Sequence, residues 1–137
     1  MYQKIMIPVD LRHVDQLAKA LSVGADLAKH YGAEAQIVSV TQSGPTEVAH
    51  NPKEFAEKLA TFTADQSNAL GFSFRAHTEI SHDPAVDLDH ALEAAAEKIG
   101  ADLIVMASHV PGFAEYFFAS NAGYLASHAS ISVLVVR

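Results

Sequence analysis

Short apolar segments alternate with longer stretches of helical spacing along the whole chain. In the first such stretch, apolar residues recur at positions 14, 17, 18, 21, 25 and 28, as on one face of an amphipathic helix. Short continuous apolar runs between turn residues are typical of buried strands. The pattern predicts strands over residues 2–9, 35–40, 73–80, 103–107 and 132–136, and helices over residues 14–31, 52–70, 84–99 and 120–128.

Several helix ends carry local signals. Asp83 precedes Pro84, which combines an acidic N-cap with proline at the first helical position. Gly32 and Gly100 follow the first and third helical stretches, at positions where glycine commonly ends a helix. Residues 41–51 include a Ser-Gly-Pro sequence and lack periodicity, so we expect a loop there.

The order of the elements defines the fold class. Strands that alternate with helices predict a parallel sheet with right-handed crossovers. Most of the strands are continuously apolar, as expected when helices cover both faces of the sheet. Residues 73–80 instead alternate apolar and polar positions, which favours a place nearer a sheet edge. We therefore predict a single doubly wound α/β domain over residues 1–137.

Composition limits the classes of partner. The formal net charge is −7, from 9 basic and 16 acidic residues, which argues against nucleic acid and against anionic lipid surfaces as partners. No window reaches the roughly 18 apolar residues that a membrane span needs, so we expect no membrane insertion. The absence of cysteine excludes disulfides and thiolate metal sites, and it suits the reducing cytoplasm, where we expect the protein to reside.

Two segments directly follow predicted strands and are candidates for ligand binding. Pro8, Val9 and Asp10 end the first strand, and residues 107–112 follow the fourth. Ligands of doubly wound sheets lie beyond the carboxyl ends of the strands, where the strand order reverses. Ser120 lies at a helix start, whose free N–H groups and positive dipole end bind phosphate readily. We therefore expect a nucleotide whose base lies near the first strand and whose phosphates point toward Ser120.

Four landmarks together resemble the universal stress protein family over essentially the whole chain. They are KIMIPVD at residues 4–10, ALEAA at 91–95, GADLIVM at 100–106 and SHASISVLVVR at 127–137. The resemblance implies an adenine-nucleotide-hydrolase-like fold: a five-stranded parallel sheet in the order 3-2-1-4-5, with helices on both faces. It also implies a homodimer formed through the strand Ser132–Val136, which agrees with the need to cover an apolar edge strand.

The phosphate loop departs from the motif of the family's nucleotide-binding members, which is G-x-x-G, nine residues, then G-[ST]. Here the glycine positions hold Ala107, Val110 and Ala119, Ser120 fills the last position, and the spacer 111–118 has eight residues. The segment instead resembles a branch of small members with a shortened His-x-Pro loop, and members of that branch bind adenine nucleotide. The implied ligand is ATP or AMP, with Mg²⁺ accompanying ATP.

The predicted nucleotide-binding residues come from both candidate segments and from the end of the second strand. Asp10 could hold the ribose or a metal-bound phosphate, or else cap the segment after its strand. His109 could contact phosphate or serve in acid–base chemistry, or else pack the loop. Ser120 could bind phosphate or act as an ordinary N-cap. The full set is Pro8, Val9, Asp10, Val40, Met106, Ala107, His109, Val110, Ala119, Ser120, Asn121 and Ala122.

Neither a metal site nor a catalytic site is predicted. The cluster His82, Asp83, Asp87, Asp89 and His90 could suggest a metal site. Acidic residues favour helix N-termini, however, which explains the acids of the cluster without a metal. The chain carries no hydrolase elbow, zinc-protease or Walker lysine pattern. It also has no lysine or arginine between Lys98 and Arg137, which favours binding over phosphoryl transfer.

Three functions remain open at this stage. The first is a small dimeric stress-response regulator that binds adenine nucleotide through a variant phosphate loop and catalyses at most slow ATP hydrolysis. The second is a family member without nucleotide, acting as a protein-interaction or chaperone-like module, which the three replaced glycines favour. The third is a small enzyme that uses His109 and Asp10.

Overall fold

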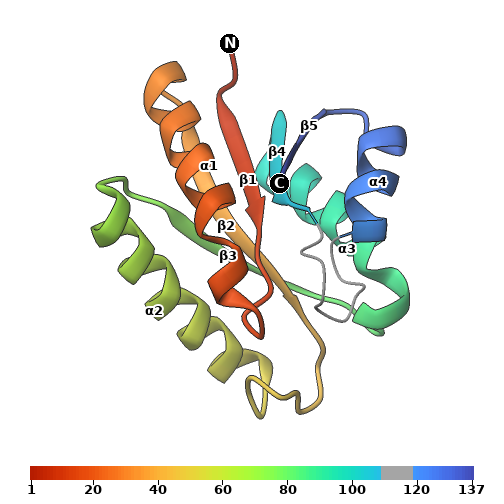
Figure 1. The fold of residues 1–137 in the computed structure, drawn as a ribbon. Helices are drawn as coiled ribbons and strands as arrows, with labels where there is room; N and C mark the ends of the chain where they lie inside the picture. Colours follow the sequence, from red (N-terminus) through yellow and green to blue (C-terminus); the bar gives the residue numbers. More distant parts are fainter. Residues whose placement is uncertain (109–118) are drawn as a thin grey trace.

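A computed structural model describes residues 1–108 and 119–137 of the chain. Their order of strands and helices is the predicted one (Figure 1). The first α-helix begins later than predicted, because residues 14–16 form a tighter 3₁₀ turn in which the Leu17 N–H donates to the Val14 C=O at 3.1 Å. The elements are β1 Lys4–Pro8, η1 Val14–Gln16, α1 Ala18–Tyr31, β2 Glu34–Thr41, α2 Pro52–Leu70, β3 Arg75–Ile80, α3 Pro84–Ile99, β4 Leu103–Ala107, α4 Ala119–His128 and β5 Ser132–Val136.

All five strands run parallel in the order β3-β2-β1-β4-β5, which confirms the predicted topology. The central strand β1 pairs with β2, where Ile5 lies beside Ala35, and with β4, where Ile5 lies beside Leu103. The strand order reverses between β1 and β4, so the carboxyl ends near this point are where ligands of such sheets bind. β3 is an edge strand, as its alternating pattern indicated.

Helices cover both faces of the sheet, which gives three layers (Figure 1). Successive strand residues point to opposite faces, so Ile5 and Ile7 pack under α1 and α2 while Met6 packs under α3 and α4. Each face therefore has its own buried cluster, with Leu59 of α2 central to one and Leu92 of α3 central to the other. None of the helices in the described residues is long and apolar enough to span a membrane.

One close approach between layers depends on glycine. Gly24 lies in the buried face of α1, directly over Ile7 of β1. A Cβ atom at Gly24 would overlap Ile7 Cδ1 and lie 3.1 Å from Ile7 Cγ1. The distance between α1 and the central strand is thus set by a residue that has no side chain.

Candidate functional site

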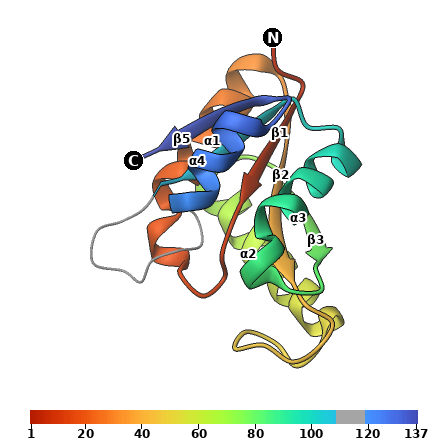
Figure 2. The same cartoon turned by 90° about the vertical axis from the view of Figure 1, so that its right-hand side faces the viewer.

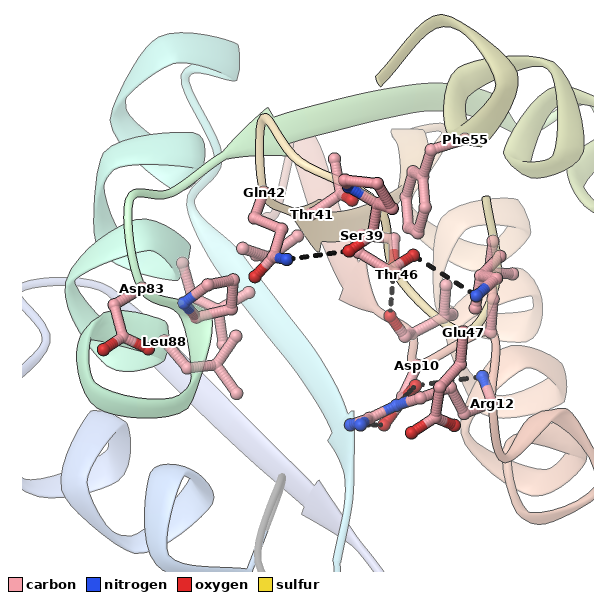
Figure 3. A pocket seen from close by; sticks show the side chains of 17 residues that line it. Asp10, Arg12, Ser39, Thr41, Gln42, Thr46, Glu47, Phe55, Asp83 and Leu88 are labelled. Atoms are coloured by element: carbon pink, nitrogen blue, oxygen red, sulfur yellow. Dashed lines mark hydrogen bonds and ion pairs between the residues drawn. The ribbon is translucent and has the colours of Figure 1, made fainter. Parts of the chain in front are cut away.

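A cavity of about 450 Å³ opens at the carboxyl ends of β1 and β2. Loop 42–51 and the start of α3 lie at the same end of the molecule as these strand ends (Figure 2). The volume falls within the range of about 300–1,000 Å³ that is usual for small-molecule sites. The described residues that line it are Val9, Asp10, Leu11, Arg12, Ser39, Val40, Thr41, Gln42, Pro45, Thr46, Glu47, Val48, Phe55, Asp83, Pro84, Leu88 and Leu92 (Figure 3).

An ion pair closes one side of the cavity. The Arg12 guanidinium donates from Nε to Asp10 Oδ1 at 3.0 Å and from Nη2 to Asp10 Oδ2 at 2.9 Å. The Arg12 backbone N–H also donates to Asp10 Oδ1 at 3.0 Å, so the acid caps the turn that follows β1. The His13 N–H donates to the Asp10 C=O at 3.0 Å and completes this turn. Asp10 is buried, whereas the Arg12 side chain is 30% exposed.

The environment of Arg12 keeps it charged. The side-chain bonds to Asp10 raise the pKa of Arg12, burial opposes this by lowering it, and the charges of Asp10 and Glu47 raise it further. The Glu47 carboxylate lies beside this ion pair in the close-up view (Figure 3). The cavity wall therefore carries a charged guanidinium, and its two-pronged contact is made with the Asp10 carboxylate.

The backbone of β2 supplies the most specific polar groups of the site. The N–H and C=O groups of one strand residue point to the same side, and successive residues alternate. Val38 faces β1, because its C=O accepts a bond of 2.8 Å from the Val9 N–H. Thr41 faces β3, because its C=O accepts a bond of 2.8 Å from the Ser81 N–H. Val40 therefore turns its N–H and C=O toward the β1 side, beyond the end of β1, at the cavity wall.

Much of the remaining wall is apolar or internally bonded. Leu88 and Leu92 of α3 and Phe55 of α2 are buried side chains that face the cavity. The hydroxyl of Ser39 donates to the Val9 C=O at 2.8 Å, so this buried polar group is satisfied within the protein. In the loop, Gln42 Nε2 donates to the Pro45 C=O at 2.9 Å. The cavity thus combines apolar walls with a few oriented polar groups, as expected of a site for a small organic ligand.

The comparison with known proteins identifies the family. A model described as "Universal stress protein family" matches residues 1–137. The chain belongs to the universal stress protein family. Universal stress protein G of Shigella flexneri is 27% identical to it over 148 aligned residues, and the alignment covers 100% of both chains.

Solved universal stress proteins share the fold. A family protein from Burkholderia pseudomallei has a TM-score of 0.70 at 25% identity, over 98% of this chain and 96% of that one. The universal stress protein from Archaeoglobus fulgidus in complex with dAMP has a TM-score of 0.70 at 17% identity, over 99% of this chain and 98% of the other.

The predicted site residues of this universal stress protein fall into three groups. Val9, Asp10 and Val40 line the cavity, while Pro8, Met106 and Ala107 are buried at strand ends and are not among the described residues that line it. His109 and Val110 lie outside the described residues. The first turn of α4 contains Ala119, Ser120 and Asn121. Ala122, the next residue of this helix, is buried.

Sequence reasoning missed several residues that this universal stress protein places at the cavity. Arg12 stands two positions after Asp10 in a polar stretch, and only the turn at Asp10 folds it back. Leu88 and Leu92 are four residues apart in α3. This spacing predicts that they share a buried helix face, but it does not show that this face lies over the carboxyl ends of the strands.

The acidic cluster at the start of α3 has one member at the cavity, Asp83, which occupies the N-cap position before Pro84 without a side-chain cap bond. Within residues 1–108 and 119–137, no group of three or more histidine, aspartate or glutamate residues is arranged to hold a metal ion.

Proposed function

We propose that this universal stress protein binds an adenine nucleotide, with the base in the cavity at the ends of β1 and β2. The proposal rests on Val40, which lines the cavity and whose N–H and C=O face the β1 side by the alternation along β2 that the bonds of Val38 and Thr41 define. Adenine presents an acceptor, N1, beside a donor, the 6-amino group. Val40 can pair with both at once, its N–H donating to N1 and its C=O accepting from the amino group.

The shape and the relatives of the protein support the same ligand. The buried side chains of Leu88, Leu92 and Val9 offer apolar contact to the faces of a planar base. The related protein from Archaeoglobus fulgidus has this fold and was solved in complex with dAMP. A backbone pair plus apolar walls is also sufficient to orient a base without any charged contact to it.

The phosphate end of the ligand points toward the start of α4 in this proposal. The helix begins at Ala119, so its first N–H groups lack intrahelical acceptors and its dipole is positive at this end. Ala107, Val110 and Ser120 belong to the variant loop that would contact phosphate. The ligand is ATP or AMP, and Mg²⁺ would enter with ATP. With no lysine or arginine in residues 99–136, any ATP hydrolysis is slow.

The base preference tests this function without altering the protein. AMP should bind at least about tenfold more tightly than GMP or IMP. Guanine and hypoxanthine carry a 6-oxo group and a protonated N1, which would face the C=O and N–H of Val40 and leave these polar groups unpaired. Isothermal titration calorimetry with the three monophosphates measures the difference.

Two outcomes of that titration contradict the proposal. Equal affinities for AMP, GMP and IMP would mean that Val40 does not recognise the base. Absence of heat and of thermal stabilisation with every nucleotide would favour the alternative of a protein-interaction or chaperone-like module. The replacement of the motif glycines at Ala107, Val110 and Ala119 is the observation behind that alternative.

The protein acts as a homodimer through β5 in this proposal. β5 lies at the sheet edge beside β4, and its residues Ser132–Val136 are half-buried or exposed. Leu134 is 38% exposed although it is a large apolar residue. Apolar edge strands are normally covered or paired, and a two-fold axis across β5 would pair this strand with itself.

Leu134→Lys should convert the dimer to monomer. The substitution is mild for the fold because the side chain is exposed, but in the dimer it brings two like charges close to the two-fold axis and weakens association at least about tenfold. Sedimentation velocity at micromolar concentration measures the change. Val86→Lys on α3 is the matched control, since Val86 is 72% exposed and lies outside β5. A Leu134→Lys protein that sediments like the wild type would refute pairing through β5.

A further inference from the structure

One buried polar residue at the cavity wall keeps a hydroxyl that the protein does not use. Of the described lining residues, three are buried and polar: Asp10, Ser39 and Thr41. Asp10 accepts bonds from Arg12, and the Ser39 hydroxyl donates to the Val9 C=O. Thr41 is 3% exposed, and its hydroxyl has no hydrogen-bond partner among the described residues (Figure 3). Buried polar groups without a partner are uncommon, so this one calls for an explanation.

The Thr41 hydroxyl opens onto the cavity. Among the described residues, Thr63 Oγ1 on α2 is the one polar side-chain atom that is fully enclosed without a partner. Thr41 Oγ1 lacks a partner as well but is not enclosed, so its remaining surface faces the cavity that Thr41 lines. The backbone fixes the residue, because the Thr41 C=O accepts a bond of 2.8 Å from the Ser81 N–H. An oriented hydroxyl of this kind is suited to a polar group of a ligand.

Thr41 directly follows the residue whose backbone is proposed to hold the base. Successive strand residues lie about 3.3 Å apart and point to opposite faces of the sheet. Val40 packs with the cluster under α3, so Thr41 projects on the α2 side, as does Ile37 four residues earlier. Phe55 of α2 lines the cavity on this side. The Val40 C=O and the Thr41 side chain are therefore consecutive groups at the same end of the cavity.

Adenine paired with Val40 would leave one donor unused at this end. The 6-amino group carries two hydrogens, and pairing with the Val40 C=O uses one of them. The second N–H would lose its water on binding, and a buried donor without an acceptor costs as much as a lost hydrogen bond. A threonine hydroxyl can accept such a bond. The ligand thus needs an acceptor where the protein holds one that is not engaged.

We propose that Thr41 is a specificity-determining residue, whose hydroxyl accepts a hydrogen bond from the second N–H of the 6-amino group of adenine. This inference rests on the proposed adenine-nucleotide site. It adds a side-chain contact to the backbone contacts of Val40 and makes the 6-amino group the most closely recognised part of the base.

Thr41→Val tests the contact, because valine keeps the shape of threonine and removes the hydroxyl. AMP binding should weaken about fivefold. Binding of purine riboside 5′-monophosphate, which lacks only the 6-amino group, should change by less than about twofold. Thr41→Ser keeps a hydroxyl and should keep the wild-type ratio of the two affinities within about twofold. Calorimetric titration gives the AMP affinities, and competition with AMP gives those of the weaker ligand.

Thr63→Val is the matched control. It makes the same chemical change at another buried hydroxyl without a partner in the described residues, on α2 and outside the described cavity lining. It should change neither affinity. Without nucleotide, both valine variants should unfold at or above the wild-type temperature, since neither loses a hydrogen bond within the described residues. Differential scanning calorimetry measures the unfolding temperatures.

The outcomes separate this inference from the function on which it rests. Unchanged AMP affinity in Thr41→Val, or equal losses for AMP and purine riboside 5′-monophosphate, would overturn the inference and leave the adenine site intact. Unfolding of Thr41→Val below the wild-type temperature without nucleotide would assign the hydroxyl to the fold and overturn the inference as well. Absence of AMP binding by the wild type would overturn the proposed function and this inference with it.

Discussion

Gly24→Leu lowers the free energy of unfolding by about 3 kcal/mol or more, the largest single-site loss that we expect in this protein. Any side chain at Gly24 overlaps Ile7, which is fully buried in the central strand. Ile7 has no solvent to move into, so either its side chain takes a less favourable rotamer or α1 shifts away from the sheet, and both disturb the packing of the buried cluster. Urea denaturation followed by circular dichroism measures the loss.

Gly123→Leu is the matched control for this prediction. Gly123 also lies inside a helix, α4, but it is exposed and a Cβ atom there has no neighbour within 4 Å. Leucine at Gly123 should leave stability unchanged or raise it by about 0.5–1 kcal/mol, since glycine is a poor helix former. If both variants lost stability equally, the close approach of α1 to β1 would not be the cause.

Glu79→Ala should lower the free energy of unfolding by about 2 kcal/mol at neutral pH, which is the second large effect that we expect. The Glu79 side chain on β3 is 6% exposed, accepts from Lys98 Nζ at 2.5 Å, and lies 3.1 Å from His77 Nε2. Removing the acid breaks both contacts and leaves a hole under α3. The loss stays below that of a wholly buried pair because the Lys98 side chain is 61% exposed and regains water.

The same carboxylate makes stability depend on pH in acid. Burial raises the pKa of Glu79, but the bonds and charges of Lys98 and His77 more than offset this, so its pKa is lowered overall. The pKa of Glu79 is thus lower in the folded protein than in the unfolded chain, where it is about 4.3. The stability that ionised Glu79 contributes is therefore fully present above the unfolded pKa and is lost as the pH falls through the folded pKa. The stability difference between wild type and Glu79→Gln should therefore persist at neutral pH and shrink below about pH 4.

Chemical denaturation of both proteins across that range checks the sign. Glu57→Gln provides the control, because Glu57 is exposed on α2 and contributes no ion pair within the described residues. A difference between wild type and Glu79→Gln that grew toward acid pH would contradict the stabilising role of the ionised Glu79.

The elements of the fold could be predicted because their signals are local. The bounds of β4 and β5 match the prediction, and α3 begins at Pro84 and is followed by Gly100 as expected. The errors come from contacts between segments. β3 begins at Arg75 rather than two residues earlier, since the N–H of Phe74 donates to Ser67 Oγ at 3.1 Å rather than to a neighbouring strand.

The candidate site could be predicted only as far as the strand ends. Asp10 and Val40 could be placed because a parallel sheet brings its carboxyl ends to one edge. The partner of Asp10 could not, because Arg12 returns to it only through a turn closed by the His13 N–H. Leu88 also escaped prediction, since periodicity identifies an apolar face but not the element opposite it.

The central position of β1 has a consequence for how the chain acquires its structure. Its first partner, β2, follows it after α1. Its second partner, β4, is synthesised only after about three quarters of the chain. During synthesis, β1, β2 and β3 can pair under α1 and α2 while the opposite face, with Met6 and Val38, still awaits α3 and α4. The nascent chain therefore exposes one apolar face of a partly formed sheet. Pairing between segments far apart in the sequence slows folding, and the exposed apolar face promotes aggregation.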